Sequence, residues 1–509
     1  MRAEGSTSAL RETLPKNAPT LKFMLFFLFF FFSDVCQGSP SLAAKSVQNP
    51  PHIPIPLQKV RLGDRNQDPL AIHQMHLRRS ARRLEFMVSR GQPSEATTHN
   101  SRTRRHRRRL HRAVAHSRGD VLSSNAKTDV SGLTKAQKDA ATVNHQPDPS
   151  PEPESDPEVT KAQSTVLPNS VPLDIEGEDI GYLATILLGT PFEAFRVLID
   201  SGSADLWVGG DDCKGDGGGG RCGKHRFLGN KSTTFRDTGR EWYLNYGTGA
   251  VSGDLVTDRV GFAGLTLKNH TFGVARSESS QFTANDIPLD GVLGCAKPSL
   301  SIQQTPTLLN SLYSAGLIAQ RVLSYRISRK SDGKNDGEMT VGAMDPSTYD
   351  PLSLVQVKNV NTGGFWEAKL GAIEVNGQNV GLVGRSCIFD TGTTLFMAQK
   401  PDVKAIHGFI PSARFDNSLK AWTMPCNTTA SVSLVFDGRP FAIDPRDLTY
   451  LPTNTTGICM SAIAEGGVSA GPTHWLVGDT FLKNIILSTN EDTNVISIAG
   501  LAKDYRYTV

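Results

Sequence analysis

The chain has 509 residues, which is enough for two or three domains and exceeds what a single ordinary hydrophobic core holds. Its 47 glycines, 29 prolines and 7% aromatic residues are compatible with a turn-rich β protein. The formal net charge of +4 hides a division, because residues 1–170 hold 25 basic and 15 acidic side chains, whereas residues 171–509 hold 29 and 35. The cationic part could bind nucleic acid, anionic membrane or the acidic part of its own chain.

The N-terminal region has the pattern of a secretory signal peptide. Lys22 and earlier basic residues precede the apolar run 23–32, and small residues follow it. The run is too short for an ordinary membrane-spanning helix, and an uncleaved signal anchor is the alternative. We therefore assign residues 1–38 to a signal peptide and expect an exported chain without a stable membrane anchor.

Residues 39–165 have the composition of a prosegment with disordered stretches. They contain the cationic run "SRTRRHRRRLHR" and the acidic, proline-rich run "HQPDPSPEPESDPEV". Paired arginines, such as Arg104-Arg105 and Arg108-Arg109, are candidate processing sites. Nucleic-acid binding is the rival interpretation of the cationic run, and we do not expect it in an exported chain.

From about Val171 the sequence becomes typical of a β protein. Short runs of Val, Ile, Leu, Phe and Thr alternate with turn residues, as in "GYLATILLGTPFEAFRVLID" and "NVISIAGLA". The best helix candidate is "PTLLNSLYSAGLI", residues 306–318. Because this region exceeds one ordinary core, we expect two β lobes, at 171–350 and 351–509.

The cysteine positions agree with export. Cys213 and Cys222 bracket the glycine-rich loop "CKGDGGGGRC" and could close it with a disulfide. Cys426 and Cys459 lie at the edges of predicted loops and could form a second bridge, whereas Cys36 belongs to the leader. Oxidised pairs are typical of exported proteins.

The other two cysteines, Cys295 and Cys387, lie in apolar, strand-like runs, and we interpret them as buried thiols. The sequence has no CxxC or His-rich group that would suggest zinc. Sequons for N-glycosylation start at Asn230, Asn269, Asn427 and Asn454.

Two motifs recur in the same order in the two predicted lobes. The segment "VLIDSGSADLWV" (197–208) matches "CIFDTGTTLFMA" (387–398). Further along the chain, "LDGVLGCA" (289–296) matches "HWLVGDTF" (474–481) in its two apolar residues before glycine. This internal repetition is too sparse for a solenoid repeat, and it predicts a duplicated lobe.

Each copy of the first motif ends an apolar run with an aspartate, Asp200 or Asp390. A buried, ionised carboxylate without a partner is costly, and two copies of one lobe could offset this cost if their aspartates faced each other. Gly202 and Gly392 lack Cβ atoms, so their backbones can approach closely and their N–H groups can donate to the carboxylates.

The hydroxyl residues of the two turns can supply further hydrogen bonds. Ser201 and Thr391 can bond across to the opposite strand, and Ser203 and Thr393 can donate to the outer carboxylate oxygens. Two carboxylates this close share one proton and titrate as a coupled pair. The charged member can then deprotonate a water while the protonated member donates to a substrate carbonyl, which predicts amide hydrolysis without metal or cofactor.

A glycine-rich hairpin, "YLNYGTGAVSGDL" (243–255), could cover such a site, with Tyr246 over the substrate. The alternative for this segment is an ordinary surface hairpin. It lacks the third glycine of the dinucleotide-binding motif and lies in a β context, which disfavours nucleotide binding.

With these motifs in this order, the region from Val171 to Val509 resembles the pepsin-like aspartic peptidases, in the form of a fungal-type secreted zymogen. The resemblance rests on "VLIDSGSADLWV", "NYGTG", "LDGVLGCAKPSLS", "CIFDTGTTLF" and "WLVGDTFL". It implies an all-β, bilobal fold with a cleft between the lobes, and a monomer that cleaves proteins or peptides at acid pH. Two carboxylates that share one proton are the established arrangement in this family.

The resemblance also implies roles for single residues. Asp200 and Asp390 would be the catalytic pair. Tyr246 would be the tyrosine of the flap, with Gly247 and Thr248 contacting the substrate backbone. Residues expected to line the cleft and bind substrate main chain are Gly202, Gly392 and Thr393. Trp207 would lie behind the flap and form a hydrogen bond with Tyr246.

Two disulfides, Cys213–Cys222 and Cys426–Cys459, match positions of the family, and a third family disulfide is missing. The cationic prosegment would cover an acidic cleft as an intramolecular inhibitor until low pH weakens its contacts. We expect secretion, with a vacuolar or lysosome-like acid compartment as the alternative.

Two rival functions remain open. A non-catalytic, pepsin-like peptide-binding protein would be expected to have lost one aspartate or the flap tyrosine. A glycosidase would place its two carboxylates farther apart and would not need twin hydroxyl-glycine turns. The sequence has no HExxH or GxSxG motif, so metallohydrolase and serine-hydrolase mechanisms have no support.

Overall fold

The computed structural model describes residues 155–165, 167–215, 222, 227, 229–246, 249–279, 282, 287–466 and 471–502. The predicted signal peptide, Cys36, the paired arginines and most of the predicted prosegment lie outside this described part. So do Gly247, Thr248 and the side chain of Tyr246.

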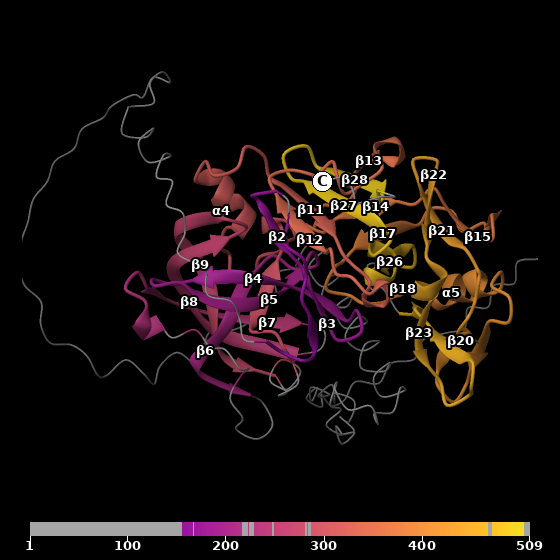
Figure 1. The fold of residues 1–509 in the computed structure, drawn as a ribbon, viewed down its shortest axis with the longest axis horizontal. Helices are drawn as coiled ribbons and strands as arrows, with labels where there is room; N and C mark the ends of the chain where they lie inside the picture. The colour runs from indigo at the N-terminus through magenta and orange to yellow at the C-terminus, as the bar shows by residue number, and fades with distance from the viewer. Residues whose placement is uncertain are drawn as a thin grey trace, which may run out of the picture. The chain divides into compact units, whose positions relative to one another are not determined.

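The largest sheet of the first half has nine strands, in the order β1-β3-β4-β5-β10-β6-β9-β8-β7. Figure 1 draws this part of the chain in indigo to magenta. Their bounds are β1 Val159–Thr160, β3 Asp174–Glu176, β4 Gly181–Leu188, β5 Glu193–Asp200, β6 Leu206–Gly215, β7 Arg236–Tyr246, β8 Gly249–Phe262, β9 Leu265–Glu278 and β10 Gly291–Gly294. Strand β1 lies within the residues assigned to the prosegment, and it pairs with β3 through Val159 and Glu176.

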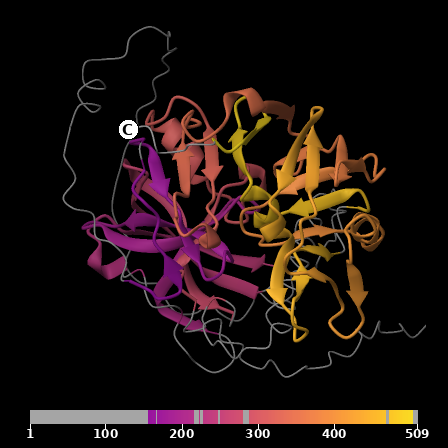
Figure 2. The same cartoon turned by 45° about the vertical axis from the view of Figure 1, so that its right-hand side comes forward.

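The second half forms three smaller sheets, drawn in orange to yellow in Figure 2. The five-stranded sheet contains, in order, β14 Glu367–Lys369, β17 Ser386–Phe389, β26 His474–Val477, β18 Phe396–Ala398 and β25 Ile463–Glu465. One four-stranded sheet contains β16 Gln378–Asn379, β15 Ala372–Val375, β21 Val432–Phe436 and β22 Arg439–Ile443. The other contains β19 Arg414–Asp416, β20 Ala421–Pro425, β24 Ile458–Ser461 and β23 Thr449–Pro452.

A six-stranded sheet contains strands from both halves of the chain. Its order is β13 Val355–Lys358, β28 Val495–Gly500, β27 Ile485–Asn490, β11 Val322–Arg326, β12 Glu338–Val341 and β2 Ser170–Pro172. The junction lies between β11 and β27, where Tyr325 pairs with Leu487. The predicted all-β architecture with two related lobes is confirmed, and this shared sheet was not predicted.

In the part of the chain that the structure describes, helices are few and short. The predicted helix at 306–318 is confirmed as α4 Leu308–Ser314, and the Thr307 side chain caps it by accepting from the Asn310 N–H at 3.2 Å. The other described helices are α5 Lys400–His407, α6 Asp479–Leu482 and the 3-10 turns η1 Gly229–Lys231, η2 Pro298–Leu300, η3 Lys330–Asp332, η4 Pro351–Ser353 and η5 Pro445–Leu448. None of the helices in the described part is long and apolar enough to cross a membrane.

The six cysteines within the described residues behave as predicted. Disulfides join Cys213 to Cys222 and Cys426 to Cys459, with Cα–Cα distances of 5.4 and 4.9 Å. Cys295 and Cys387 are buried thiols. Burial raises the pKa of the Cys295 thiol to about 12, so this group stays protonated and packs as a small apolar side chain.

Removal of the second disulfide is expected to destabilise the protein strongly. Cys426 and Cys459 are 33 positions apart, so their bridge restricts a long loop of the unfolded chain. We predict that replacing both by serine lowers the free energy of unfolding by about 3–4 kcal/mol, measured by chemical denaturation. In excess dithiothreitol, which also reduces Cys213–Cys222, wild type and variant should be equally stable. Equal stability of the two oxidised proteins would contradict the prediction.

Candidate active site

The two predicted aspartate motifs occupy equivalent places in duplicated strand arrangements. In the first half, β10 lies between β5, to which it is parallel, and β6, to which it is antiparallel. In the second half, β26 lies in the same way between β17 and β18. Asp200 ends β5, and Asp390 directly follows β17. The structure therefore confirms the internal duplication that the sequence predicted.

The glycine of the second motif is needed for close backbone contact in both copies. The Gly294 N–H donates to the Asp205 carbonyl at 3.0 Å, and the Gly478 N–H donates to the Leu395 carbonyl at 3.2 Å. A Cβ atom on Gly294 would lie 2.4 Å from the Asp205 nitrogen, and one on Gly478 would lie 1.9 Å from the Thr393 carbonyl oxygen. Only glycine allows these strands to meet the aspartate turns.

The carboxylate of Asp200 is fully buried and held by its own turn. The Gly202 N–H donates to Asp200 Oδ1 at 2.8 Å, and Ser203 Oγ donates to Oδ2 at 2.6 Å. These bonds orient the carboxylate and offset part of the cost of its burial.

Asp390 has the same environment in the second copy. Its side chain is also fully buried, the Gly392 N–H donates to Oδ1 at 3.0 Å, and Thr393 Oγ1 donates to Oδ2 at 2.6 Å. The hydrogen bonds that the sequence predicted from Gly202, Ser203, Gly392 and Thr393 are therefore all present.

Four reciprocal hydrogen bonds join the two turns. The Ser201 N–H donates to Thr391 Oγ1, and the Thr391 N–H donates to Ser201 Oγ, each at 3.0 Å. In addition, Ser201 Oγ donates to the Phe389 carbonyl at 3.1 Å, and Thr391 Oγ1 donates to the Ile199 carbonyl at 2.8 Å. Residues 190 positions apart thus form one site, and each aspartate adjoins the cross-linked pair in sequence.

The predicted flap hairpin is described up to its tip. Strands β7 and β8 pair as far as Tyr246 opposite Gly249. Trp207 is buried, and its ring lies 6.4 Å from the ring of Trp242, on β7, and 5.4 Å from that of Phe282. Its predicted hydrogen bond to Tyr246 stays a prediction, because the tyrosine side chain lies outside the described part.

Asp205 is a supporting residue that we did not single out from the sequence. It is buried, and it accepts hydrogen bonds from Ser301 Oγ at 2.5 Å and from the Ile302 N–H at 2.8 Å. These bonds tie the strand that follows Asp200 to the segment after β10. The sequence signal that could have revealed it is a difference between the two copies of the aspartate motif, because the second copy has Leu395 where the first has Asp205.

A comparison with protein-family models finds the eukaryotic aspartyl protease family over residues 181–501. The match includes both aspartate turns and the strands that hold them. The chain belongs to the eukaryotic aspartyl protease family. The predicted resemblance to the pepsin-like aspartic peptidases is thereby confirmed.

Curated relatives of this chain include fungal and vertebrate proteins. A "Probable aspartic-type endopeptidase CTSD" of Arthroderma benhamiae is 34% identical over 340 residues, 67% of this chain and 64% of the relative. The "Aspartic-type endopeptidase ctsD" of Aspergillus fumigatus is 32% identical over 343 residues, 67% and 70% of the two chains. Cathepsin E of Aquarana catesbeiana is 28% identical over 312 residues, 60% and 75% of the two chains. The match spans just under two thirds of the first of these relatives.

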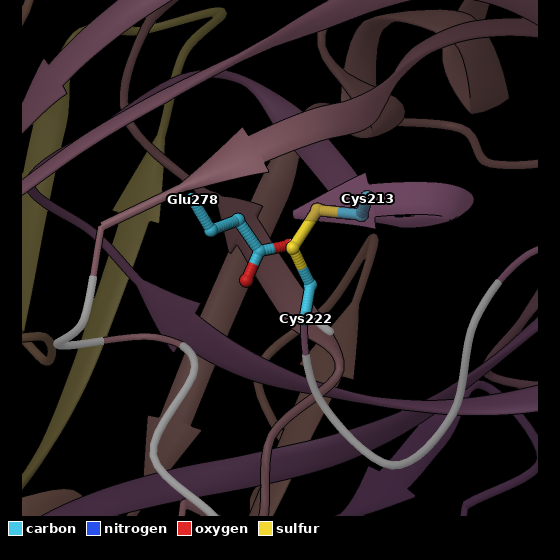
Figure 3. Close-up of side chains that lie close together, drawn as sticks. All are labelled: Cys213, Cys222 and Glu278. Carbon is cyan, nitrogen blue, oxygen red and sulfur yellow. A yellow bond between two sulfur atoms is a disulfide. The ribbon is translucent and has the colours of Figure 1, made fainter. Parts of the chain in front are cut away.

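A buried carboxyl lies beside the first disulfide, as Figure 3 shows. Glu278 Oε1 lies 3.6 Å from Cys213 Sγ, and Cys222 completes the group. Among the residues that the structure describes, these three have the residue types of a metal site. The sulfurs form a disulfide, however, and only thiolates are effective ligands. Burial, followed by the charge of Asp290, raises the pKa of Glu278 to about 8.

We predict that Glu278 makes the protein less stable as the pH rises. Its folded-state pKa lies above the unfolded value of 4.5, so its contribution is complete below pH 4.5 and is lost as the pH rises toward 8. Glu278→Gln should match wild type near pH 4 and exceed it at pH 7.5, by up to about 4 kcal/mol of unfolding free energy. Unfolding curves at both pH values measure this, and a variant less stable at pH 7.5 would refute the prediction.

The Thr391 hydroxyl, which cross-links the two turns, is expected to stabilise the protein through the hydrogen bonds that it both donates and accepts. Thr391→Val keeps the shape but removes a hydroxyl that donates to Ile199 and accepts from Ser201, leaving buried polar groups unsatisfied. We predict a loss of about 2 kcal/mol in unfolding free energy, measured by chemical denaturation. Thr391→Ser, which keeps the hydroxyl, is the matched control and should lose much less; equal losses would contradict the prediction.

Proposed function

We propose that this aspartyl protease is an active endopeptidase that hydrolyses amide bonds of proteins or peptides at acid pH. We assign the acid-base chemistry to Asp200 and Asp390. The observation that carries this proposal is the reciprocal hydrogen bonding of Ser201 and Thr391, because it joins two identically held, buried aspartates in one site.

The mechanism follows from a pair of carboxylates that hold one proton between them. The charged carboxylate takes a proton from a bound water, whose oxygen attacks the carbonyl carbon of the substrate amide. The protonated carboxylate gives its proton to the carbonyl oxygen, which yields a neutral tetrahedral diol. In the collapse of the diol, the protonated carboxylate donates its proton to the amide nitrogen and the charged carboxylate takes a proton from a diol hydroxyl. The C–N bond breaks, and the pair again holds one proton. No covalent enzyme intermediate is formed.

The surrounding residues position the substrate. We assign main-chain binding to Gly202, Gly392 and Thr393, which belong to the turns that hold the carboxylates. The β7–β8 hairpin brings Tyr246 to the end of its pairing, and we assign to this residue, Gly247 and Thr248 the role of a flap that covers the substrate and excludes water.

The remaining assignments concern the life of the protein as a secreted precursor. We propose that residues 1–38 direct export, that the cationic prosegment inhibits the enzyme until acid pH weakens its contacts, and that the enzyme acts as a monomer. An acid compartment of the cell is the alternative location. All four sequon asparagines, Asn230, Asn269, Asn427 and Asn454, are exposed, which supports them as glycosylation sites.

The test is the conservative removal of either carboxylate. After acid activation, Asp200→Asn and Asp390→Asn should each lower kcat on a protein substrate by roughly 10³-fold or more, because neither amide can exchange the shared proton. Circular dichroism should show an intact fold. Asp437→Asn, at an exposed turn, is the matched control and should keep wild-type kcat. Activity retained in either active-site variant would refute the mechanism, and an inactive wild type would favour a non-catalytic binding protein.

A further inference from the structure

A second set of polar side chains lies on the strands that carry Asp390. Glu367 on β14, Ser386 on β17 and His474 on β26 come from three adjacent strands of the five-stranded sheet. His474 Nδ1 lies 2.6 Å from Glu367 Oε1 and 3.2 Å from Ser386 Oγ. Ser386 Oγ also donates to Glu367 Oε1, and Asn361 Nδ2 donates to the other carboxylate oxygen at 2.7 Å.

This cluster is built into the frame of the active site. Ser386 and His474 are register partners where β17 and β26 begin their parallel pairing. Three residues after Ser386, the Phe389 N–H donates at 2.9 Å to the carbonyl of Trp366, the residue directly before β14. The Asp390 N–H donates to the Val477 carbonyl of β26 at 3.1 Å. The same three strand segments therefore carry the cluster at one end and fix the backbone of Asp390 at the other end.

We propose that His474 and Glu367 form a pH-dependent clamp that positions Asp390 by holding β14, β17 and β26 together. Both are positioning residues, because they act through the strands and do not touch the reacting atoms. This assignment of a role in catalysis rests on the proposed function of Asp390, whereas the clamp itself does not.

The burial of the two partners suits a clamp that responds to pH. The Glu367 side chain is 3% exposed, so its charge needs a partner, whereas the His474 side chain is 32% exposed and can exchange a proton with solvent. The hydrogen bond to Glu367 raises the pKa of His474 above its ordinary 6.5, against the opposing effect of partial burial. Burial opposes but does not cancel the lowering of the Glu367 pKa by His474, Asn361 and Ser386.

Other titratable and charged groups nearby do not compete for this pair. The Cys387 thiol on β17 is buried, and burial followed by the charge of Glu367 raises its pKa. Arg385, which precedes Ser386, pairs with Asp402 at 2.7 Å. Lys369, the register partner of Ser386 on β14, is exposed.

The sign of the pH dependence follows from the directions in which the pKa values of His474 and Glu367 are shifted. The raised pKa of His474 means that its contribution is complete below about pH 6.5 and is lost as the pH rises through the folded-state value. The lowered pKa of Glu367 means that its contribution is present above about pH 4.5. The clamp is therefore strongest in mildly acid solution and weakens toward neutral pH.

Thermal unfolding of the full-length chain tests the clamp directly. An Asp200→Asn background prevents self-cleavage, and His474→Asn removes the titrating ring but keeps a donor near Glu367. We expect the melting temperature to fall by roughly 2–4 °C at pH 5.5 and by much less at pH 7.5. Glu367→Gln should do the same, and the double variant should lose little more than either single one, because the two residues act as a pair. Equal losses at both pH values, or no loss at either, would overturn the clamp.

Another histidine of the same half is the matched control. His407 is buried, burial lowers its pKa to about 4, and it bonds to Ser461 on a different sheet. Because the unfolded chain takes up a proton on this ring near pH 6.5 and the folded chain does not, the contribution of His407 to stability is smaller at pH 5.5 than at pH 7.5. His407→Gln should therefore lower the melting temperature less at pH 5.5 than at 7.5, which is the opposite of His474→Asn. A larger loss at pH 5.5 in both variants would show that the effect at His474 is not specific to the clamp.

Kinetics in the otherwise wild-type enzyme test the positioning role. His474→Asn should lower kcat at pH 5.5 by roughly 10-fold with KM nearly unchanged, because the geometry of Asp390 and not substrate contact is altered. The difference from wild type should shrink toward neutral pH. If His474→Asn had the kcat of wild type at all pH values, the positioning role would be refuted, whereas the proposed function would stand. If Asp390→Asn were active, the proposed function and the positioning role would both fail, and the melting data would still decide the clamp.

Discussion

The site depends on one interaction, the exchange of hydrogen bonds between Ser201 and Thr391. Each hydroxyl accepts from the opposite backbone N–H and donates to a carbonyl on the opposite strand. Each turn therefore supplies hydrogen-bond partners to the buried backbone groups of the other. Neither half of the chain can satisfy these buried groups alone. This mutual satisfaction places two aspartates in one buried site, where a single carboxylate would be costly.

The duplicated strands explain why the two halves of the site are so similar. In each half a strand that ends at a glycine (β10) or just before one (β26) lies between the strand that leads to the aspartate and the strand that leaves it. The absence of a side chain on Gly294 and Gly478 lets that strand bond to the turn itself. The carboxylate orientation therefore comes mainly from backbone geometry, with one hydroxyl added on each side by Ser203 or Thr393.

Much of the site could be predicted from the sequence, because its signals are local and repeated. The aspartates, the glycines, the four hydroxyl residues and helix α4 all followed from short patterns. Glu278 and the His474–Glu367 pair could not be found in this way, since their partners lie 65 and 107 positions away. No periodicity or motif reports such contacts. Strand β1 was missed for a different reason: two residues in an acidic, proline-rich context give no strand pattern.

The six-stranded sheet has a consequence for how the chain acquires its structure during synthesis. Its middle strand from the first half, β11, is flanked on one side by β12 and on the other by β27, which begins at Ile485. Until the ribosome has delivered β27, the edge of β11 lacks its neighbour and offers unpaired backbone groups to other chains. The sheet thus waits for residues 485–490, and fragments that stop before them are expected to aggregate.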